Sequence, residues 1–353
     1  MSQKILMKGN EVIAEASIRA GCRYYFGYPI TPQNEIPAYM AKKMPLVDGV
    51  FIQAESEIAA INMVYGAAST GVRTMTTSSS PGISLKQEGI SYLAGAELPA
   101  VVANVVRCGP GLGGILSSQS DYFQAVKGGG HGDYRLYVLA PANLQEMYEL
   151  TVDAFDIAEK YRIVSMIMAD SILGQMMEEV EFRDSEEIKE YDKSWAVLGT
   201  KKKREPNIIT SIHIEPDILE ELNNRLQSKY KEIEKNEMRV EVFNCEDADV
   251  IVAAFGTASR IVKNVIDTLC EEGIKVGLIR PITLWPFPVE TFKKYANVPK
   301  AFLTVEINAG QMVEDVKLSV NGKREVYFCG RTGGNIPTEK EITEKIREIY
   351  RSN

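Results

Sequence analysis

Apolar and polar positions alternate in blocks along the first half of the chain, and each block has the period of a strand or of a helix. Helical spacing marks a segment that opens at Pro32 and also residues 8–20, 56–71, 81–97 and 142–161. The short apolar runs between them, typical of buried strands, are residues 22–28, 49–55, 73–80, 99–107, 133–140 and 162–170. Because strands and helices in strict turn build a parallel sheet with helices on both faces, we predict a doubly wound α/β fold. The small-residue helix 56–71 is predicted to be buried.

The pattern changes after residue 176. Charged residues dominate up to about residue 236, and within this stretch residues 216–239 have the spacing of an exposed linker helix. A second, smaller α/β unit begins near residue 247 and ends in a terminal helix. We therefore expect one domain over residues 1–178, a charged linker region over 179–240 and a second domain over 241–353.

Composition narrows the classes of partner. The chain has 353 residues, a formal net charge of −8 and no apolar run of membrane-spanning length free of charges. These values argue against a nucleic-acid or membrane partner, and the single basic run, residues 201–204, reads as a solvated loop. We expect a cytoplasmic protein. Five scattered cysteines without CxxC spacing and two histidines give no disulfide framework and no metal or iron–sulfur site on this chain.

The stretch YPITP at residues 28–32 fixes the backbone firmly around Thr31. A proline locks its own φ and biases the residue before it toward extended geometry, so Thr31 is predicted to cap a helix whose first residue is Pro32. Capping alone is one explanation of the threonine. The other is functional, because a strand end that faces a helix N-terminus is where open α/β sheets bind anionic ligands.

Two charged residues stand at the ends of apolar segments. Glu57 opens the apolar helix 56–71, where the helix dipole favours a carboxylate by about 0.3 to 1 kcal/mol; a carboxylate beside a buried face is also suited to proton exchange with a heteroaromatic nitrogen. Arg107 ends a buried strand. Its guanidinium is expected to pair either with a carboxylate of the protein or with the carboxylate of a substrate.

The glycine-rich segment RCGPGLGG at residues 107–114 matches G-x-G-x-x-G through Gly109, Gly111 and Gly114. The dinucleotide fingerprint normally occupies a first strand-to-helix turn, whereas this segment lies in the middle of the sheet. We interpret it as a glycine-rich active-site loop and keep a nicotinamide site as the alternative. His131, in GGGHGDY, is assigned to turn stabilisation, with a place in the substrate pocket as the alternative.

Thr31, Glu57 and Arg107 all fall at carboxyl ends of strands, so one crevice can collect them. Together with SEIAAINMVYGAA, DYFQAVKGGGHGDY, RPITLWPFP, NAGQMVEDV and GRTGGNIPT, they make the chain similar to the α subunit of a thiamine-diphosphate-dependent 2-oxoacid:ferredoxin oxidoreductase. The resemblance covers nearly the whole length. It is strongest to the branched-chain, 2-oxoisovalerate type, with the 2-oxoglutarate type close behind.

The resemblance assigns roles to the residues already singled out. It implies that residues 1–178 hold the aminopyrimidine ring of thiamine diphosphate and that the last hundred or so residues form a transketolase C-terminal-like domain. Glu57 would hydrogen-bond the ring nitrogen N1′, with Pro29 and Ile30 beside the cofactor. Thr31 and Arg107 would receive the substrate carboxylate. Gly111 and His131 are weaker candidates for the substrate pocket.

Two features of the family are missing from this chain. No GDG motif for the diphosphate and its Mg²⁺ occurs, and no cysteine cluster for [4Fe-4S] centres. The resemblance therefore implies a β subunit with the diphosphate half-site and a ferredoxin-like iron–sulfur subunit, with a γ subunit as an open option. The complex would oxidatively decarboxylate a 2-oxoacid, with coenzyme A as acyl acceptor and ferredoxin as electron acceptor. The alternatives are 2-oxoglutarate as substrate, a nicotinamide-dependent oxidoreductase, and a scaffold subunit whose site has decayed.

Overall fold

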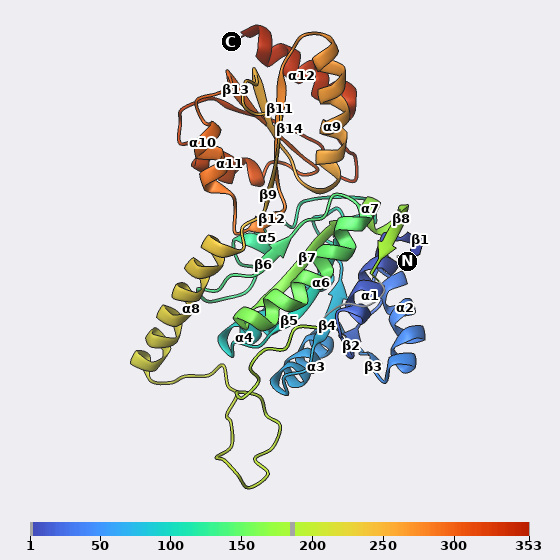
Figure 1. Cartoon of the computed structure of the whole chain (residues 1–353), viewed down its shortest axis with the longest axis vertical. Coiled ribbons are helices and arrows are strands. Elements are labelled where there is room, and N and C mark those ends of the chain that lie inside the picture. Colours follow the sequence, from blue (N-terminus) through green and yellow to red (C-terminus); the bar gives the residue numbers. More distant parts are fainter. Residues whose placement is uncertain (1–2, 184–187, 353) are drawn as a thin grey trace.

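The computed structural model describes residues 3–183 and 188–352, and the two larger of its three β-sheets follow each other along its longest axis (Figure 1). The larger sheet has seven strands, which are parallel except for one edge strand. Their spatial order is β12 (Thr283–Trp285), β6 (Tyr137–Leu139), β7 (Val164–Asp170), β5 (Ala100–Val106), β4 (Thr74–Ser78), β2 (Tyr24–Gly27) and β3 (Val50–Gln53). The predicted doubly wound α/β sheet is confirmed.

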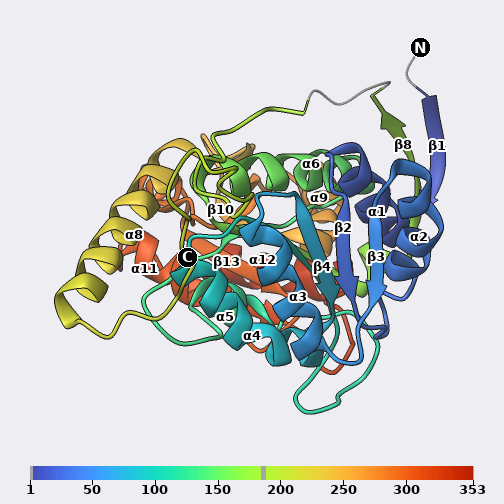
Figure 2. The same ribbon diagram turned by 90° about the horizontal axis from the view of Figure 1, so that it is seen from below.

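Helices cover both faces of this sheet, as the alternating pattern predicted (Figure 2). One face is covered by α1 (Gly9–Arg19), α2 (Glu35–Lys43) and α6 (Leu144–Tyr161), the other by α3 (Glu57–Ser69) and α4 (Ser80–Gly95). Short elements complete the unit: η1 (Met44–Val47), α5 (Tyr122–Val126) and α7 (Ser171–Gln175). The parallel strands β5 and β7 are buried along their whole length, which explains their uninterrupted apolar sequences.

The strand order reverses beside β2. The chain passes from β2 outward to β3 and then returns across β2 to β4, so α2 and α3 leave the sheet on opposite faces. In open α/β sheets such a switch point leaves a crevice at the carboxyl ends of the strands, where ligands bind. The turns after β2, β3 and β5 carry Thr31, Glu57 and Arg107 to this edge.

The smaller sheet has five strands and its own helices. Its spatial order is β14 (Val326–Gly330), β13 (Ala301–Glu306), β10 (Val250–Ala253), β11 (Val276–Pro281) and β9 (Val240–Phe243), of which β9 is antiparallel. The helices are α9 (Gly256–Glu271), α10 (Val289–Tyr295), α11 (Met312–Val320) and α12 (Glu339–Ser352). A separate apolar cluster packs α9 and α12 against this sheet.

Four strands, β1, β8, β9 and β12, lie where the sequence pattern gave no strand. β1 (Gln3–Lys8) pairs antiparallel with β8 (Met177–Phe182), inside the stretch that we expected to be irregular. β12 comes from the second half of the chain but extends the larger sheet by pairing with β6. The predicted linker helix is confirmed as α8 (Pro216–Asn236), and it reaches β12 through an edge-to-face contact of Tyr230 with Trp285. Residues 184–187 of the predicted linker lie outside the described residues.

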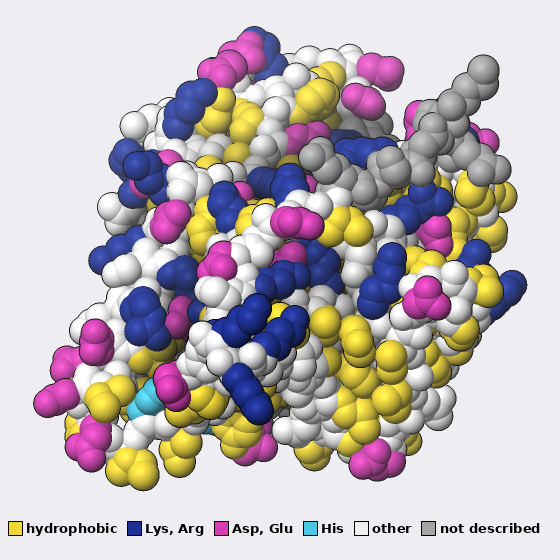
Figure 3. All heavy atoms as spheres, turned by 60° about the horizontal axis from the view of Figure 1, so that its bottom comes forward, with side chains coloured by type: hydrophobic (Ala, Val, Ile, Leu, Met, Phe, Trp, Pro, Cys, Tyr) yellow, Lys and Arg dark blue, Asp and Glu magenta, His cyan; other side chains and the backbone are white. Residues whose placement is uncertain are grey.

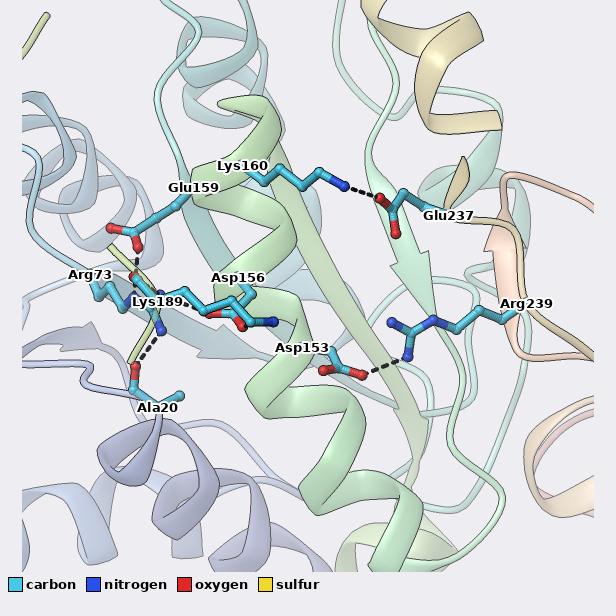
Figure 4. A network of polar contacts seen from close by, with 9 residues as sticks. All are labelled: Ala20, Arg73, Asp153, Asp156, Glu159, Lys160, Lys189, Glu237 and Arg239. Carbon is cyan, nitrogen blue, oxygen red and sulfur yellow. Dashed lines mark hydrogen bonds and ion pairs between the residues drawn. The ribbon is translucent and has the colours of Figure 1, made fainter. Parts of the chain in front are cut away.

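Buried charges at the amino-terminal edge of the larger sheet are neutralised within the chain (Figure 4). Arg73, just before β4, donates to Asp156 and Glu159 of α6 at 2.8 Å each and to the carbonyl of Ala20 at 2.6 Å. Lys189 and Lys193 pair with the same two carboxylates at 3.0 and 2.6 Å. This network holds the described part of the linker against the sheet.

The face on the far side from the smaller sheet carries mixed charges (Figure 3). Lys and Arg side chains gather near its centre with Asp and Glu around them. Residues 201–204 are all exposed, as predicted for a solvated loop. Within the described residues, no helix combines the length and the apolar character needed to cross a membrane.

Candidate active site

The turn after β2 holds Thr31 by its backbone. Thr31–Pro32 is a cis peptide bond, and the amide of Gln33 closes the turn by donating to the carbonyl of Ile30 at 3.0 Å. The carbonyl of Pro32 accepts from Asn10 at 2.7 Å and from Gln175 at 2.9 Å. This turn corrects the prediction that Thr31 caps a helix, because α2 begins at Glu35 and its N-cap residue is Asn34.

The side chain of Thr31 is exposed, and its hydroxyl accepts a 3.5 Å hydrogen bond from Asn34. Pro29 is exposed and Ile30 half-buried, so this stretch presents a polar hydroxyl next to two apolar residues at the edge of the sheet. The threonine hydroxyl does not cap a helix. The firmly held backbone therefore fixes the position of the Thr31 side chain at this edge.

Glu57 is the first residue of α3 and is only 5% exposed. The helix starts there because Ser56 has extended backbone geometry and its hydroxyl accepts from the amide of Ala59 at 3.1 Å. Among residues 3–183 and 188–352, no group donates a hydrogen bond to the Glu57 carboxylate or forms an ion pair with it. A buried carboxylate without a partner is costly, so it is a strong indication of a missing ligand.

The first turn of α4 lies directly against this carboxylate. A Cβ atom at Gly82 would stand 2.5 Å from Glu57 Oε1 and 2.0 Å from Ser78 Oγ, so only glycine permits this approach. The hydroxyls of Ser78 and Ser79 are buried and have no hydrogen-bond partner in the described part of the chain. Glu57 thus lies among further polar atoms that are also left without partners.

Arg107 follows β5 and is 9% exposed. Its Nη1 donates to the carbonyl of Thr31 and its Nη2 to the carbonyl of Leu112, both at 3.0 Å. Its Nε is buried without a partner, and no carboxylate of the described residues pairs with it. Of the two expectations for this guanidinium, pairing with a carboxylate of the protein is therefore wrong, and the charge remains available to an anion.

Arg107 and Glu57 are joined through α4. The hydroxyl of Ser80 accepts from the Arg107 amide and donates to its carbonyl, both at 3.1 Å, two residues before Gly82. The structure therefore brings Thr31, Glu57 and Arg107 to one edge of the sheet, at the switch point.

The glycine-rich segment forms an irregular loop. Gly111 and Gly113 have φ values of +72° and +58°, and a Cβ atom at Gly113 would lie 1.9 Å from the carbonyl oxygen of Cys108. Gly111 is exposed beside Leu112, whose carbonyl holds Arg107, so this candidate lies at the site. The next helix is α5, which begins at Tyr122. Because no helix N-terminus follows the glycines, the loop lacks the geometry that a dinucleotide fingerprint needs.

His131 lies elsewhere. Its carbonyl accepts from the Ser91 hydroxyl at 2.6 Å and its ring packs edge-on against Tyr92, near the far end of α4. Ser91 is eleven residues beyond Ser80, about 16 Å along the helix axis. The structure does not bring His131 to the site, and its contacts match the turn-stabilising role.

Sequence reasoning missed the residue that fastens the glycine-rich loop to the second unit. Gln119 donates through Nε2 to the carbonyl of Phe255 at 2.8 Å and accepts from the Ile307 amide at 3.0 Å. Its own backbone bonds Ile307 and Asn308 at 2.8 and 3.0 Å. A polar residue in a loop gave no sequence signal of this role, because Phe255, Ile307 and Asn308, its partners in the second unit, lie more than 130 positions away.

Lys86 of α4 was also missed, although it carries a signal. It is fully buried, and its Nζ donates to the hydroxyl of Thr76 at 2.9 Å. Burial lowers the pKa of Lys86 to about 8, and the attraction of Glu57 opposes this shift. The signal in the sequence is that Lys86 lies between Gly82 and Gly89 on one face of the helix. Glycines on a helix face indicate that a neighbouring element packs closely against it.

A pocket of about 580 Å³ opens beside Thr31. Its walls come from the turn after β2, the glycine-rich loop, α7 and the loop after β14, and they include Thr31, Leu116, Ser117, Ile172, Gly334 and Ile336. The lining contains no lysine or arginine, and Glu35 is its one carboxylate. Both units of the chain therefore contribute to an apolar cavity that the exposed Thr31 side chain reaches.

Apolar side chains around this edge are exposed. Leu112 is 83% exposed, Ile115 and Leu116 are 58% exposed, and Ile58 of α3 is 49% exposed. The prediction that the helix of residues 56–71 is buried is wrong for the face of Ile58, Asn62 and Gly66, which is exposed in this chain. A helix that is apolar on all sides normally has all of its sides covered.

The chemistry available at this edge is acid–base and anion-binding. Glu57 can accept or donate one proton, and Arg107 and the Thr31 hydroxyl can hold a small anion. Among the described residues, no three or more His, Cys, Asp or Glu side chains form a group that could hold a metal ion.

Two family models match the chain. Residues 15–242 match pyruvate flavodoxin/ferredoxin oxidoreductase, thiamine diP-bdg, the thiamine-diphosphate-binding part. Residues 248–342 match pyruvate:ferredoxin oxidoreductase core domain II. Together the two matches leave out only short segments at the ends and between them.

Among characterised relatives, the ketoisovalerate oxidoreductase subunit VorB of Methanothermobacter marburgensis is 52% identical over 344 residues, covering 98% of this chain and 97% of the relative. The 2-oxoglutarate synthase subunit KorA of Methanocaldococcus jannaschii is 36% identical over 362 residues, covering 96% and 98%.

Among solved structures, the 2-oxoglutarate:ferredoxin oxidoreductase of Magnetococcus marinus superposes with a TM-score of 0.89 at 28% identity over 98% of this chain. The chain spans 65% of that protein's length. A split-gene transketolase, 14% identical with a TM-score of 0.61 and 98% coverage of both chains, shares the fold.

Proposed function

We propose, from the premise that this chain belongs to the 2-oxoacid:ferredoxin oxidoreductases as their α subunit, that Glu57 is the residue through which it acts on thiamine diphosphate. The observation that carries this proposal is the buried, unpartnered carboxylate at the switch point. A carboxylate kept without an internal partner is ready to hold a proton shared with a ligand nitrogen.

The residues fit the ring half of the cofactor. Glu57 offers one proton-exchanging oxygen, Gly82 lets the first turn of α4 lie directly against it, and Pro29 and Ile30 present apolar surface at the same edge. When bound, thiamine diphosphate supplies the carbanion chemistry of decarboxylation. The part of this chain is to orient the ring and to hold or move the proton at Glu57.

The substrate carboxylate is assigned to Arg107 and Thr31. Within the described part of the chain no carboxylate neutralises the charge of Arg107, and its side chain already bonds the backbone carbonyl of Thr31. Gly111 stays a candidate for the loop that encloses the substrate, because it lies next to the carbonyl that holds Arg107.

We assign a branched-chain 2-oxoacid, 2-oxoisovalerate, as the substrate. The pocket beside Thr31 has no lysine or arginine for a second carboxylate, which a 2-oxoglutarate site would need, and its walls include Leu116, Ile172 and Ile336. The relatives at 52% and 49% identity are both named ketoisovalerate oxidoreductase subunits. The products would be the branched acyl-CoA, carbon dioxide and two reduced ferredoxins.

The remaining half of the site is assigned to partner subunits. This chain contains no GDG motif, and its five cysteines stand far apart in the sequence. We therefore assign the diphosphate and Mg²⁺ to a β subunit and the [4Fe-4S] centres to the β subunit and a ferredoxin-like subunit. The open face of α3 at Ile58, Asn62 and Gly66 is the surface that we assign to the β subunit, because it begins one residue from Glu57. The domain boundaries proposed are 1–178, 179–240 and 241–353.

The test is a substrate screen on the complex purified with its partners. 2-Oxoisovalerate, 2-oxoglutarate, pyruvate and an aryl 2-oxoacid are each supplied with coenzyme A and a viologen dye. We expect the highest kcat/KM with 2-oxoisovalerate. A preference for 2-oxoglutarate would overturn the substrate assignment, and dye reduction that depends on NAD rather than on coenzyme A would overturn the reaction.

A further inference from the structure

The glycine-rich loop is part of a hairpin, residues 107–119, that continues β5. At its base Arg107 pairs with Ser117 in an antiparallel bridge. Between these two residues the chain folds back, so that the Leu112 carbonyl accepts from Arg107 Nη2 at 3.0 Å. The position of Leu112 relative to the guanidinium therefore depends on the returning segment of the hairpin, residues 116–119.

The second unit of the chain holds this returning segment through Gln119, which is 2% exposed. Gln119 bonds Ile307, the residue after β13, twice: its amide donates to the Ile307 carbonyl at 2.8 Å, and its Oε1 accepts from the Ile307 amide at 3.0 Å. Its Nε2 donates to the carbonyl of Phe255 at 2.8 Å, and its carbonyl accepts from Asn308 at 3.0 Å. Every polar group of Gln119 thus joins the hairpin to the second unit.

The turn after β14 contacts the returning segment at Leu116. Gly334 has a φ of +92°, and an added Cβ atom would stand 2.6 Å from the Cβ atom of Leu116. The neighbouring Gly333 also has a positive φ, +67°, but a Cβ atom added there would meet no atom within 4 Å. Both positions favour glycine by their backbone conformation, whereas only Gly334 is also required by a contact with the hairpin.

Two backbone carbonyls orient the Arg107 guanidinium. Nη1 donates to the carbonyl of Thr31, in the turn after β2, and Nη2 donates to the carbonyl of Leu112, in the hairpin. A guanidinium binds a carboxylate best when its plane is fixed, because two of its N–H groups then meet the two oxygens together. A displaced hairpin would remove one of the two carbonyls and leave this plane free to turn.

We propose that the second unit positions Arg107 for the substrate, with Gln119 and Gly334 as the positioning residues. They hold the returning segment of the hairpin, so that the Leu112 carbonyl stays within reach of the guanidinium. This inference rests on the substrate role proposed for Arg107. It gives the second unit a part in substrate binding, although the residues that bond the Arg107 side chain in the described part of the chain all belong to the first unit.

The first experiment measures amide hydrogen exchange in the full-length chain without cofactor. The amides of Cys108 and Gly114 donate within the hairpin to the carbonyls of Leu116 and Cys108, at 3.1 and 3.0 Å. In Gln119→Met, which keeps the side chain long but removes both of its hydrogen bonds, these two amides should exchange about 10-fold faster, because the hairpin opens more easily. The amide of Gln33, in the turn after β2, should keep its wild-type rate.

The matched control for this experiment is Arg260→Met. Arg260 of α9 also makes two side-chain bonds between the units, to the carbonyl of Ala142 at 3.0 Å and to Glu178 at 2.8 Å, and neither partner belongs to the hairpin. Its replacement should leave the exchange of the two hairpin amides at the wild-type rate. Unchanged exchange in Gln119→Met, or equally faster exchange in Arg260→Met, would overturn the inference.

The second experiment separates KM from kcat in the complex with its partners. Gly334→Ala pushes against Leu116, so it should raise KM for 2-oxoisovalerate about 10-fold, because a binding group misplaced by a fraction of an ångström holds its ligand poorly. Its kcat should stay within about twofold of the wild type, since Glu57 is untouched. Gly333→Ala, which strains the same turn without a contact, should keep the wild-type KM. An unchanged KM in Gly334→Ala would overturn the inference, and this test stands even if Gln119→Met fails to fold.

A double-mutant cycle tests whether the effect passes through Arg107. The double variant Arg107→Met, Gln119→Met should have the KM of Arg107→Met alone, because the hairpin then has no guanidinium to position. Two effects on KM that multiply would overturn the inference. If Arg107→Met raises KM but Gln119→Met and Gly334→Ala do not, this inference fails alone. If Arg107→Met leaves KM unchanged, the proposed substrate site fails.

Discussion

Buried charges are paired within the chain at one edge of the larger sheet but not at the other. At the amino-terminal edge, Arg73 is 6% exposed and bonds two carboxylates and a carbonyl. At the carboxyl edge, Arg107 is 9% exposed, bonds only backbone carbonyls and keeps a buried Nε without a partner. Both arginines adjoin strands of the same sheet and are almost equally buried. Burial therefore does not explain why one is paired with carboxylates and the other is not.

The charges at the amino-terminal edge stabilise the fold by pairing with one another, whereas those at the carboxyl edge are available to a ligand. Arg73, Asp156 and Glu159 neutralise one another and fix the linker, as Figure 4 shows. Glu57 and Arg107 carry opposite charges at one edge, yet the structure gives no hydrogen bond or ion pair between them. Charges left apart in this way can bind a cofactor and a substrate without first breaking an internal pair.

The largest effect is expected at the carboxyl edge, from Glu57→Gln. Turnover of the complex should fall by about 10²- to 10⁴-fold, the usual scale for a lost proton-transfer group. Glu55→Gln is the matched control, since Glu55 is exposed two residues earlier and should keep wild-type turnover. Steady-state dye reduction measures both variants, and near-normal turnover in Glu57→Gln would remove Glu57 from the reaction.

At the amino-terminal edge the effect should be on stability. Arg73→Met removes the partner of two buried carboxylates, and the free energy of unfolding should fall by about 3 kcal/mol or more. Arg107→Met breaks no ion pair and should cost about 1 kcal/mol. Denaturant unfolding of the two variants measures this contrast directly. Equal losses would show that the two edges do not differ in the way described.

The smallest effect is expected on substrate use in Arg107→Met. The loss of one charge-assisted contact to a carboxylate, worth about 1.5 to 3 kcal/mol, should raise KM for the 2-oxoacid about 10- to 150-fold. Binding of thiamine diphosphate, followed by calorimetry, should remain close to that of the wild type. An unchanged KM would remove Arg107 from the substrate site.

The sequence predicted the elements around this site better than the site's finer geometry. The apolar runs of β5 and β7 and the apolar stripes of α1 and α6 report burial directly, so the parallel sheet followed from them. β12 escaped prediction because it is three residues long and pairs with a strand about 145 positions earlier in the chain. β1 and β8 alternate charged and apolar residues only weakly, and they are stabilised by pairing with each other.

The site residues divide in the same way. Glu57 and Arg107 could be singled out because a charge at the end of an apolar run is visible in sequence. The turn at Thr31 was misassigned, because the sequence does not show that Asn10 and Gln175 hold the turn by bonding the Pro32 carbonyl. The burial of Lys86 was overlooked because it depends on the packing of α4 against α3 at Gly82 and Gly89, which the sequence does not show.

The most direct test is a structure of the complex with thiamine diphosphate and its partner subunits bound. We expect a carboxylate oxygen of Glu57 at hydrogen-bond distance, about 2.6–3.2 Å, from a nitrogen of the aminopyrimidine ring, with the open face of α3 against the partner. A ring bound away from Glu57, or a Glu57 carboxylate paired with a side chain of the partner, would contradict the account.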